Sequence, residues 1–96
     1  MEETQIRWSD YMLYRMKERG YEAATIEEII RHSAERYTDT DSGRTVIVGR
    51  HHELLVLIPI ETDGSTIVPI TVHATTRQQI RFRLQSEYES STNDVF

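Results

Sequence analysis

Three side chains late in the chain have the types and the spacing for acid–base chemistry at a phosphate. His73 is followed four residues later by Arg77, and Arg81 comes four residues after that. Cleavage of RNA without a metal needs a base for the 2′-hydroxyl, a cation for the phosphate in the transition state and an acid for the leaving oxygen. The candidate catalytic residues are therefore His73, as acid or base, with Arg77 and Arg81 as cations. The structural alternative for His73 is a histidine that ends a strand and is capped by residues 74–76.

Two further arginines, Arg50 and Arg83, are candidates for binding RNA phosphates. Arg50 precedes His51 and His52, which form a second candidate group, but a polar hairpin turn is the favoured interpretation of these two histidines. Adjacent histidines make poor bidentate ligands, and no carboxylate accompanies them at a suitable spacing. We therefore predict no metal site and no other cofactor.

The formal net charge of −5 argues against nonspecific nucleic-acid binding over the whole surface. The charges are unevenly distributed, because residues 44–83 carry five basic and three acidic side chains, whereas the segments before and after them are acidic overall. A locally basic working surface on an acidic chain fits this pattern. The simpler interpretation, that the charges only keep the surface solvated, fits it as well.

The composition is typical of one soluble domain. The chain has 96 residues, of which 38% are hydrophobic, and it contains no cysteine, which excludes disulfides and thiolate metal sites. Its longest apolar run, residues 54–60, is far shorter than the roughly 20 residues of a membrane-spanning helix. The acidic start of the chain is unlike a signal peptide, so we expect a cytoplasmic location without membrane association. We expect an ordered core at residues 8–89 and a flexible tail at 90–96.

Three apolar runs rich in β-branched residues predict an antiparallel meander. They occupy residues 45–48, 54–60 and 67–72, and short polar turns separate them. The segment 36–40 is a candidate edge strand. Each of the two prolines in the last hairpin lacks a ladder donor, which predicts a bulge or an interrupted pairing near its middle.

The last strand of the meander has two different faces. Strict alternation places Val68 and Val72 against the helices, and it places Ile67 and His73 on the opposite face. We expect this second face to need a cover of its own.

Two helices precede the strands. Ser9 is the expected N-cap of the first helix, and Gly20 is its expected left-handed stop. Thr25 and Glu28 form a capping box, which predicts the start of the second helix. Helices followed by strands indicate an α+β fold, in which two N-terminal helices pack on a three- to four-stranded antiparallel sheet.

The segment 77–88 is open between a C-terminal helix and a strand. Thr76 and Gln79 have the form of a capping box, and the apolar residues that follow recur at helical spacing. Strict alternation in the same segment also fits a strand. Phe82 separates the two, because a helix directs it away from Ile80 and a strand places it alongside. A helix is favoured because the cap is well formed.

Four segments carry a combined pattern: residues 9–20, in which Arg15-Met16 and Arg19-Gly20 are spaced along a helix, and residues 25–31, 43–50 and 70–73. In these segments the chain resembles a family of small bacterial domains of unknown function, distantly grouped with BrnT-type and RelE-type toxins of toxin–antitoxin systems. The resemblance covers roughly residues 8–84. It implies an α+β fold and, for the toxin relatives, RNA cleavage held in check by an antitoxin protein. Members commonly carry histidine where this chain has Tyr11, so no role of that histidine is carried over.

A protein-interaction module without catalytic activity is the alternative function. An open sheet face or an exposed strand edge can bind a partner chain or, in a homodimer, a second copy of this chain. The acidic net charge and the tyrosine at position 11 favour this alternative. RNA cleavage and protein pairing therefore both stay open.

Overall fold

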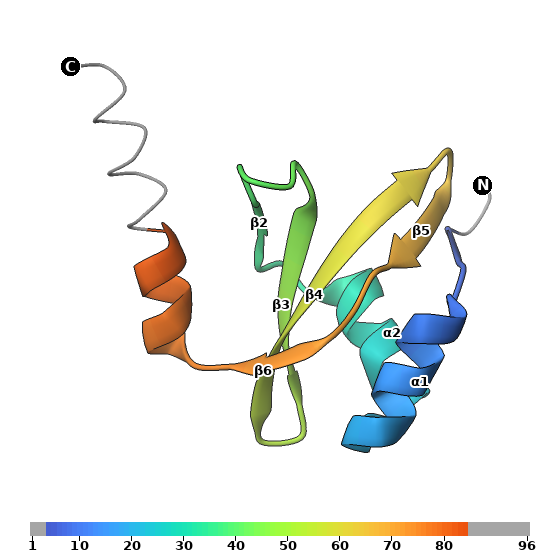
Figure 1. The fold of residues 1–96 in the computed structure, drawn as a ribbon, viewed down its shortest axis with the longest axis horizontal. Coiled ribbons are helices and arrows are strands. Elements are labelled where there is room, and N and C mark those ends of the chain that lie inside the picture. The colour runs from blue at the N-terminus through green and yellow to red at the C-terminus, as the bar shows by residue number, and fades with distance from the viewer. Residues whose placement is uncertain (1–3, 85–96) are drawn as a thin grey trace.

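The computed structural model describes residues 4–84, which form three helices and one six-stranded sheet (Figure 1). In chain order the elements are β1 (Gln5–Ile6), α1 (Asp10–Arg19), α2 (Ala23–His32), β2 (Arg36–Thr38), β3 (Thr45–His51), β4 (Leu54–Asp63), β5 (Thr66–Pro69), β6 (His73–Thr75) and a third helix at residues 77–84. The predicted α+β class is confirmed. The prediction of three to four antiparallel strands is wrong, because the described sheet has six strands and β1 runs parallel to β5.

The long strand β4 is the centre of the sheet. β3 pairs with one of its edges, and β5 and β6 share the other edge. β1 lies beyond β5, and β2 lies beyond β3, so the order is β1-β5-β4-β3-β2. The side chains of residues 55–58 are buried on both faces of β4, as its continuous apolar run predicts.

A β-bulge separates β5 from β6. The pairing of β4 with β5 ends at Pro69, and its pairing with β6 resumes at His73, so three residues (70–72) oppose two (58–59). The first amide of the three-residue segment donates to the carbonyl of Pro59 at 2.8 Å. The bulge predicted from the two prolines is confirmed.

The bulge reverses the side of the chain that faces α1 and α2. Ile67 in β5 and Val72 just before β6 both pack into the core on that side. His73 lies opposite Leu57, whose side chain belongs to the core on the other face. The predicted placement of Ile67 on the same face as His73 is therefore wrong, because strict alternation does not survive an inserted residue. The placement of Val72 against the helices is confirmed.

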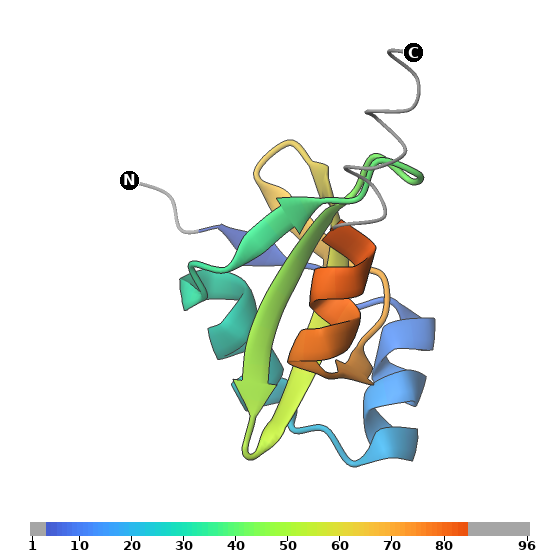
Figure 2. The ribbon, with the colours of Figure 1, turned by 90° about the vertical axis from the view of Figure 1, so that its left-hand side faces the viewer.

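Helices pack on both faces of the sheet (Figure 1). α1 and α2 pack on one face, and the third helix packs on the other, as Figure 2 shows from the side of the third helix. On that second face Ile80 of the third helix inserts among side chains of β3 and β4, namely Val46, Val48, Leu55 and Leu57. Within residues 4–84 no helix has the length and apolar character that crossing a membrane requires.

The third helix settles the question left open for residues 77–88. Thr76 caps it, because its Oγ1 accepts a hydrogen bond from the amide of Gln79 at 3.1 Å. Ile80 is buried, whereas Phe82 is 71% exposed. The two side chains therefore point in different directions, as they do in a helix, whereas a strand would place them on the same face. The predicted helix is confirmed up to residue 84. Its continuation and the predicted tail lie outside the described residues.

The start of α2 differs from the prediction. The helix begins at Ala23, after Glu22, and the capping box of Thr25 and Glu28 is wrong because Thr25 already lies inside the helix. The amide of Glu22 donates to Nε2 of the buried His51 at 2.8 Å, so a contact with the β3–β4 hairpin sets the helix start. Both predicted ends of α1 are confirmed by the hydrogen bond of the N-cap side chain and by the left-handed glycine at its C-cap.

Candidate functional site

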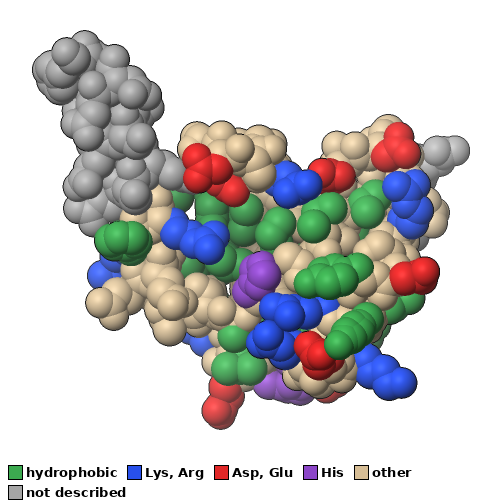
Figure 3. All heavy atoms as spheres, viewed as in Figure 1, with side chains coloured by type: hydrophobic (Ala, Val, Ile, Leu, Met, Phe, Trp, Pro, Cys, Tyr) green, Lys and Arg blue, Asp and Glu red, His purple; other side chains and the backbone are tan. Residues whose placement is uncertain are grey.

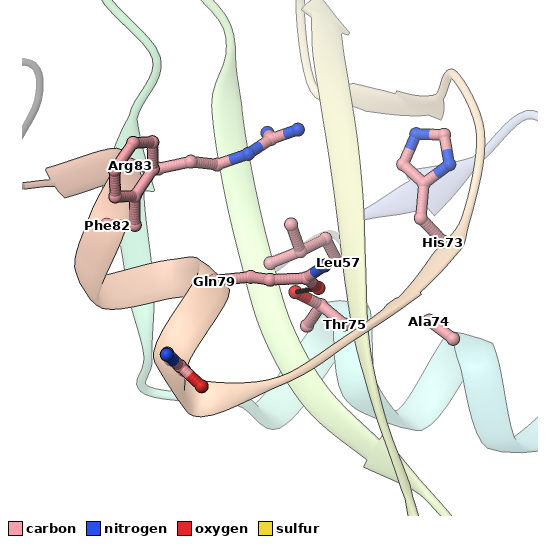
Figure 4. A pocket seen from close by; sticks show the side chains of 8 residues that line it. Leu57, His73, Ala74, Thr75, Gln79, Phe82 and Arg83 are labelled. Atoms are coloured by element: carbon pink, nitrogen blue, oxygen red, sulfur yellow. Dashed lines mark hydrogen bonds between the residues drawn. The ribbon is translucent and has the colours of Figure 1, made fainter.

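An open cleft lies between β6 and the third helix, with a volume of about 490 Å³ (Figure 4). His73 projects from β6, Arg83 extends from the helix, and Leu57 of β4 lies between them. The other lining residues are Ala74, Thr75, Gln78, Gln79 and Phe82. The size is within the range of pockets that bind small ligands or parts of larger ones.

Local structure explains why His73 and Arg83 both line this cleft. The bulge directs His73 to the face that carries Leu57, and the Thr76 cap starts the third helix immediately after β6. Ile80 anchors this helix on the sheet, and Arg83 follows three positions later on a neighbouring part of the helix surface. The cleft is therefore a consequence of the bulge and the cap together.

The environment of His73 favours its neutral form. Partial burial and, after it, the positive charges of Arg15, Arg83 and Arg19 lower the pKa of His73 from its ordinary value of 6.5. The imidazole is therefore predominantly uncharged at pH 7 and is able to accept a proton. A neutral base beside several cations is suited to deprotonating a hydroxyl next to a phosphate.

Arg15 of α1 acts on His73 from outside the cleft, because its charge lowers the pKa of His73 but its side chain does not line the cleft. Its side chain is 21% exposed, and its Nε atom is buried without a hydrogen-bond partner among the described residues. Its contact with Glu18 is long, at 4.0 Å between Nη1 and Oε1. The charge of Arg15 is therefore only weakly compensated where it acts on His73. The sequence places Arg15 and Arg19 on one helix, but no local pattern links α1 to β6 and so to His73.

The other predicted site residues lie elsewhere. Arg77 forms an ion pair with Glu35 and does not line the cleft. Arg81 is exposed and also does not line the cleft. Arg50 donates to the carbonyl of Glu53 at 3.2 Å within the β3–β4 hairpin. Of the five predicted residues, the structure brings together His73 and Arg83.

A second cluster of polar side chains lies at the β3–β4 hairpin. Possible ligand atoms of Glu22, His51 and His52 all lie within 4.8 Å of one another. The lone pair of His51 Nε2 is already used by the amide of Glu22, and His52 Nε2 lies 2.8 Å from the Glu22 carboxylate. This contact lowers the pKa of the Glu22 carboxyl, because the hydrogen bond and the charge of His52 favour its ionised form. The arrangement explains how the hairpin is fastened to α2.

The surface around the cleft combines three kinds of side chain. Figure 3, viewed as Figure 1, shows a histidine with basic side chains on two sides of it and hydrophobic side chains nearby, and the exposed aromatic residues of the described chain are Tyr11, Tyr14 and Phe82. Basic and aromatic side chains in alternation are typical of surfaces that bind single-stranded nucleic acids. The net charge of the whole chain hides this local feature.

Comparisons with models of protein families, with curated proteins and with solved structures found no match to this chain.

Proposed function

We propose that this protein is a toxin-like ribonuclease whose active site is the cleft between β6 and the third helix. The observation that carries the proposal is the position of His73, which combines a lowered pKa with access to an open cleft and the nearby charges of Arg15 and Arg83. In the cleavage of a phosphodiester by its neighbouring 2′-hydroxyl, a base removes the hydroxyl proton and cations stabilise the charge on the phosphate.

In the proposed reaction His73 takes the proton from the 2′-hydroxyl of a bound nucleotide. The 2′-oxygen attacks the adjacent phosphorus, the bond from phosphorus to the 5′-oxygen breaks, and a 2′,3′-cyclic phosphate forms. Arg15 and Arg83 stabilise the negative charge that builds up on the phosphate oxygens in the transition state.

The leaving 5′-oxygen takes its proton from solvent in this proposal. Apart from His73 and Arg83, the described side chains that line the cleft are apolar or carry only hydroxyl and amide groups. None of these has an ordinary pKa suited to general acid catalysis near pH 7. We therefore expect a rate that rises with pH to a plateau near neutrality, and not a bell-shaped profile.

The resemblance to toxin relatives supports the cellular role. An antitoxin protein that covers the cleft would control a toxin of this kind, and the basic side chains around His73 give an acidic segment a surface to bind. For the alternative of a noncatalytic module, the third helix narrows the open sheet face, because it covers side chains of β3 and β4 on that face. Its other surfaces are exposed strand edges, such as those of β1 and β2.

Incubation of the purified protein with end-labelled single-stranded RNA in EDTA tests the proposal. We expect cleavage products that end in a 2′,3′-cyclic phosphate, identified by mass spectrometry. EDTA removes the contribution of contaminating metal-dependent nucleases. Intact RNA after incubation with a molar excess of folded protein would contradict the proposed function and favour the noncatalytic module.

The pH dependence of cleavage tests the role of Arg83. The base form of His73 is unprotonated, so the rate is lost as the pH falls through its pKa, and the lowered pKa keeps the protein active below the ordinary histidine range. Arg83→Gln removes one of the charges that lower this pKa. We expect the rising limb of kcat/KM to move to higher pH in the variant, in addition to a lower plateau.

Arg7→Gln is the matched control for this experiment. Arg7 follows β1, pairs with Asp63 at 3.6 Å and does not line the cleft, so the variant removes the same charge without changing the surroundings of His73. Its rising limb should coincide with that of the wild type. A limb that stays in place for Arg83→Gln would show that Arg83 does not act on the base.

A further inference from the structure

Two exposed tyrosines lie on the face of α1 that carries Arg15. Tyr11, Tyr14 and Arg15 are three or four positions apart or adjacent, so they share one side of the helix. Tyr11 is 58% exposed and Tyr14 is 55% exposed. The hydroxyl of Tyr14 donates to the Glu18 carboxylate at 2.6 Å, which restrains the ring while its faces stay accessible.

This face of α1 adjoins the proposed active site. The charge of Arg15 acts on both Tyr14 and His73, so the arginine lies near both side chains. Figure 1 shows that β6 runs between α1 and the third helix, so the two helices stand on opposite sides of the strand that begins with His73. Hydrophobic and basic side chains lie next to one another on this side of the molecule in Figure 3.

A third exposed aromatic ring lies in the cleft itself. Phe82 lines the cleft from the third helix and is 71% exposed. Phe82 lines the cleft, whereas Tyr14 lies on α1, so a ligand that occupies the cleft and extends over α1 can contact both rings. Nucleobases stack on such rings irrespective of sequence, and only unpaired bases have both faces free to do so.

We propose that the cleft binds single-stranded RNA, with Tyr14 and Phe82 stacking on bases on the two sides of His73. This inference rests on the proposed function for the class of substrate, and it adds the strandedness and two base-binding positions. Arg15 and Arg83, next to these rings, hold the phosphates between the stacked bases. Cleavage then falls on the linkage held beside His73.

Equilibrium binding tests this inference separately from cleavage. The probe is a fluorescein-labelled oligouridine of about ten nucleotides, a length within the span of known single-strand sites, and the protein is the full chain carrying His73→Ala so that no probe is cut. In this background Tyr14→Leu and Phe82→Leu should each weaken binding about five-fold or more, as measured by fluorescence anisotropy. Tyr14→Phe keeps the ring and should bind within about two-fold of the parent.

Two controls identify stacking as the cause. Leu54→Ala removes an exposed apolar side chain at the start of β4, outside the cleft, and should leave binding unchanged. An oligomer of the same length and charge that lacks bases should bind more weakly than oligouridine, and Tyr14→Leu should not weaken it further. A duplex RNA of the same length should be equally insensitive to Tyr14→Leu.

The outcomes separate the two proposals. Equal affinity of the Tyr14→Leu and Phe82→Leu variants and their parent for oligouridine would overturn the stacking positions, whatever the cleavage assay shows. An equal loss with the base-free oligomer would also overturn them, because the rings would then act on the backbone. Ring-dependent binding by a protein whose wild type leaves RNA intact would support this inference while contradicting ribonuclease activity.

Discussion

Replacement of His73 by alanine is expected to lower the rate of RNA cleavage about 100-fold or more, the usual contribution of a general base. The variant loses the neutral imidazole that receives the proton of the 2′-hydroxyl, while the charges of Arg15 and Arg83 remain. Initial rates on a short single-stranded substrate, compared at saturating and at limiting RNA, measure the loss. The effect should appear mainly in kcat, because phosphate binding is left to the arginines.

The fold should tolerate this change. The side chain of His73 is only partly buried at the beginning of β6 and makes no hydrogen bond to the described residues. The folded state disfavours protonation of His73, so the pKa of His73 is lower in the folded protein than in the unfolded chain. As the pH falls below 6.5, the unfolded chain takes up the proton first and the folded protein loses stability. His73→Ala removes this loss. An unchanged thermal midpoint at pH 7 is the expected check.

His32→Ala provides the matched control for His73→Ala. His32 is the last residue of α2, is exposed and does not line the cleft, so its variant should cleave RNA as the wild type does. Wild-type activity in His73→Ala would assign cleavage to another group or to a contaminating nuclease, and the proposed active site would be wrong.

Gly49→Ala is expected to destabilise the protein by about 1–3 kcal/mol, the range for overpacking a close-packed core. A Cβ atom at position 49 of β3 would lie 2.4 Å from Cγ2 and 2.9 Å from Cγ1 of Ile29. Ile29 is a buried β-branched residue of α2, and its side chain has little rotational freedom in a helix. Either the helix must move away from the sheet or the isoleucine must leave its preferred rotamer. Urea unfolding measures the change in free energy.

A double-mutant cycle tests the assigned cause. Ile29→Ala alone should cost about 2–5 kcal/mol, because it leaves a cavity between α2 and β3. In the double variant the new methyl group enters that space, so its cost should be clearly less than the sum of the two single costs. Additive costs would contradict the contact as the cause. Gly64→Ala is the control for backbone strain alone, since position 64 has a φ of 63° and nothing within 4 Å of the added atom.

The sequence by itself determined the elements that local chemistry controls. A hydroxyl side chain and a glycine define the ends of α1, and the Thr76 cap starts the third helix. The continuous apolar run identifies β4 as the central strand, and the two prolines predict the bulge between β5 and β6. In each case the residues that determine the feature are neighbours in the chain, so their hydrogen-bonding groups and backbone preferences can be read from the sequence without knowledge of the tertiary structure.

The tertiary structure decided what depends on partners distant in the chain. The buried His51 moves the start of α2 ahead of its capping box, and the parallel pairing of β1 with β5 has no local signal. The bulge was predictable, but its effect on which side chains face the helices became clear only from the register. The same holds for the candidate site. The spacing in the sequence grouped Arg77 and Arg81 with His73. In the structure Arg77 pairs with Glu35, and a charge that acts on His73 comes from Arg15 of α1. The packing of helices and strands, and not the distance along the chain, determines which charged groups lie near one another.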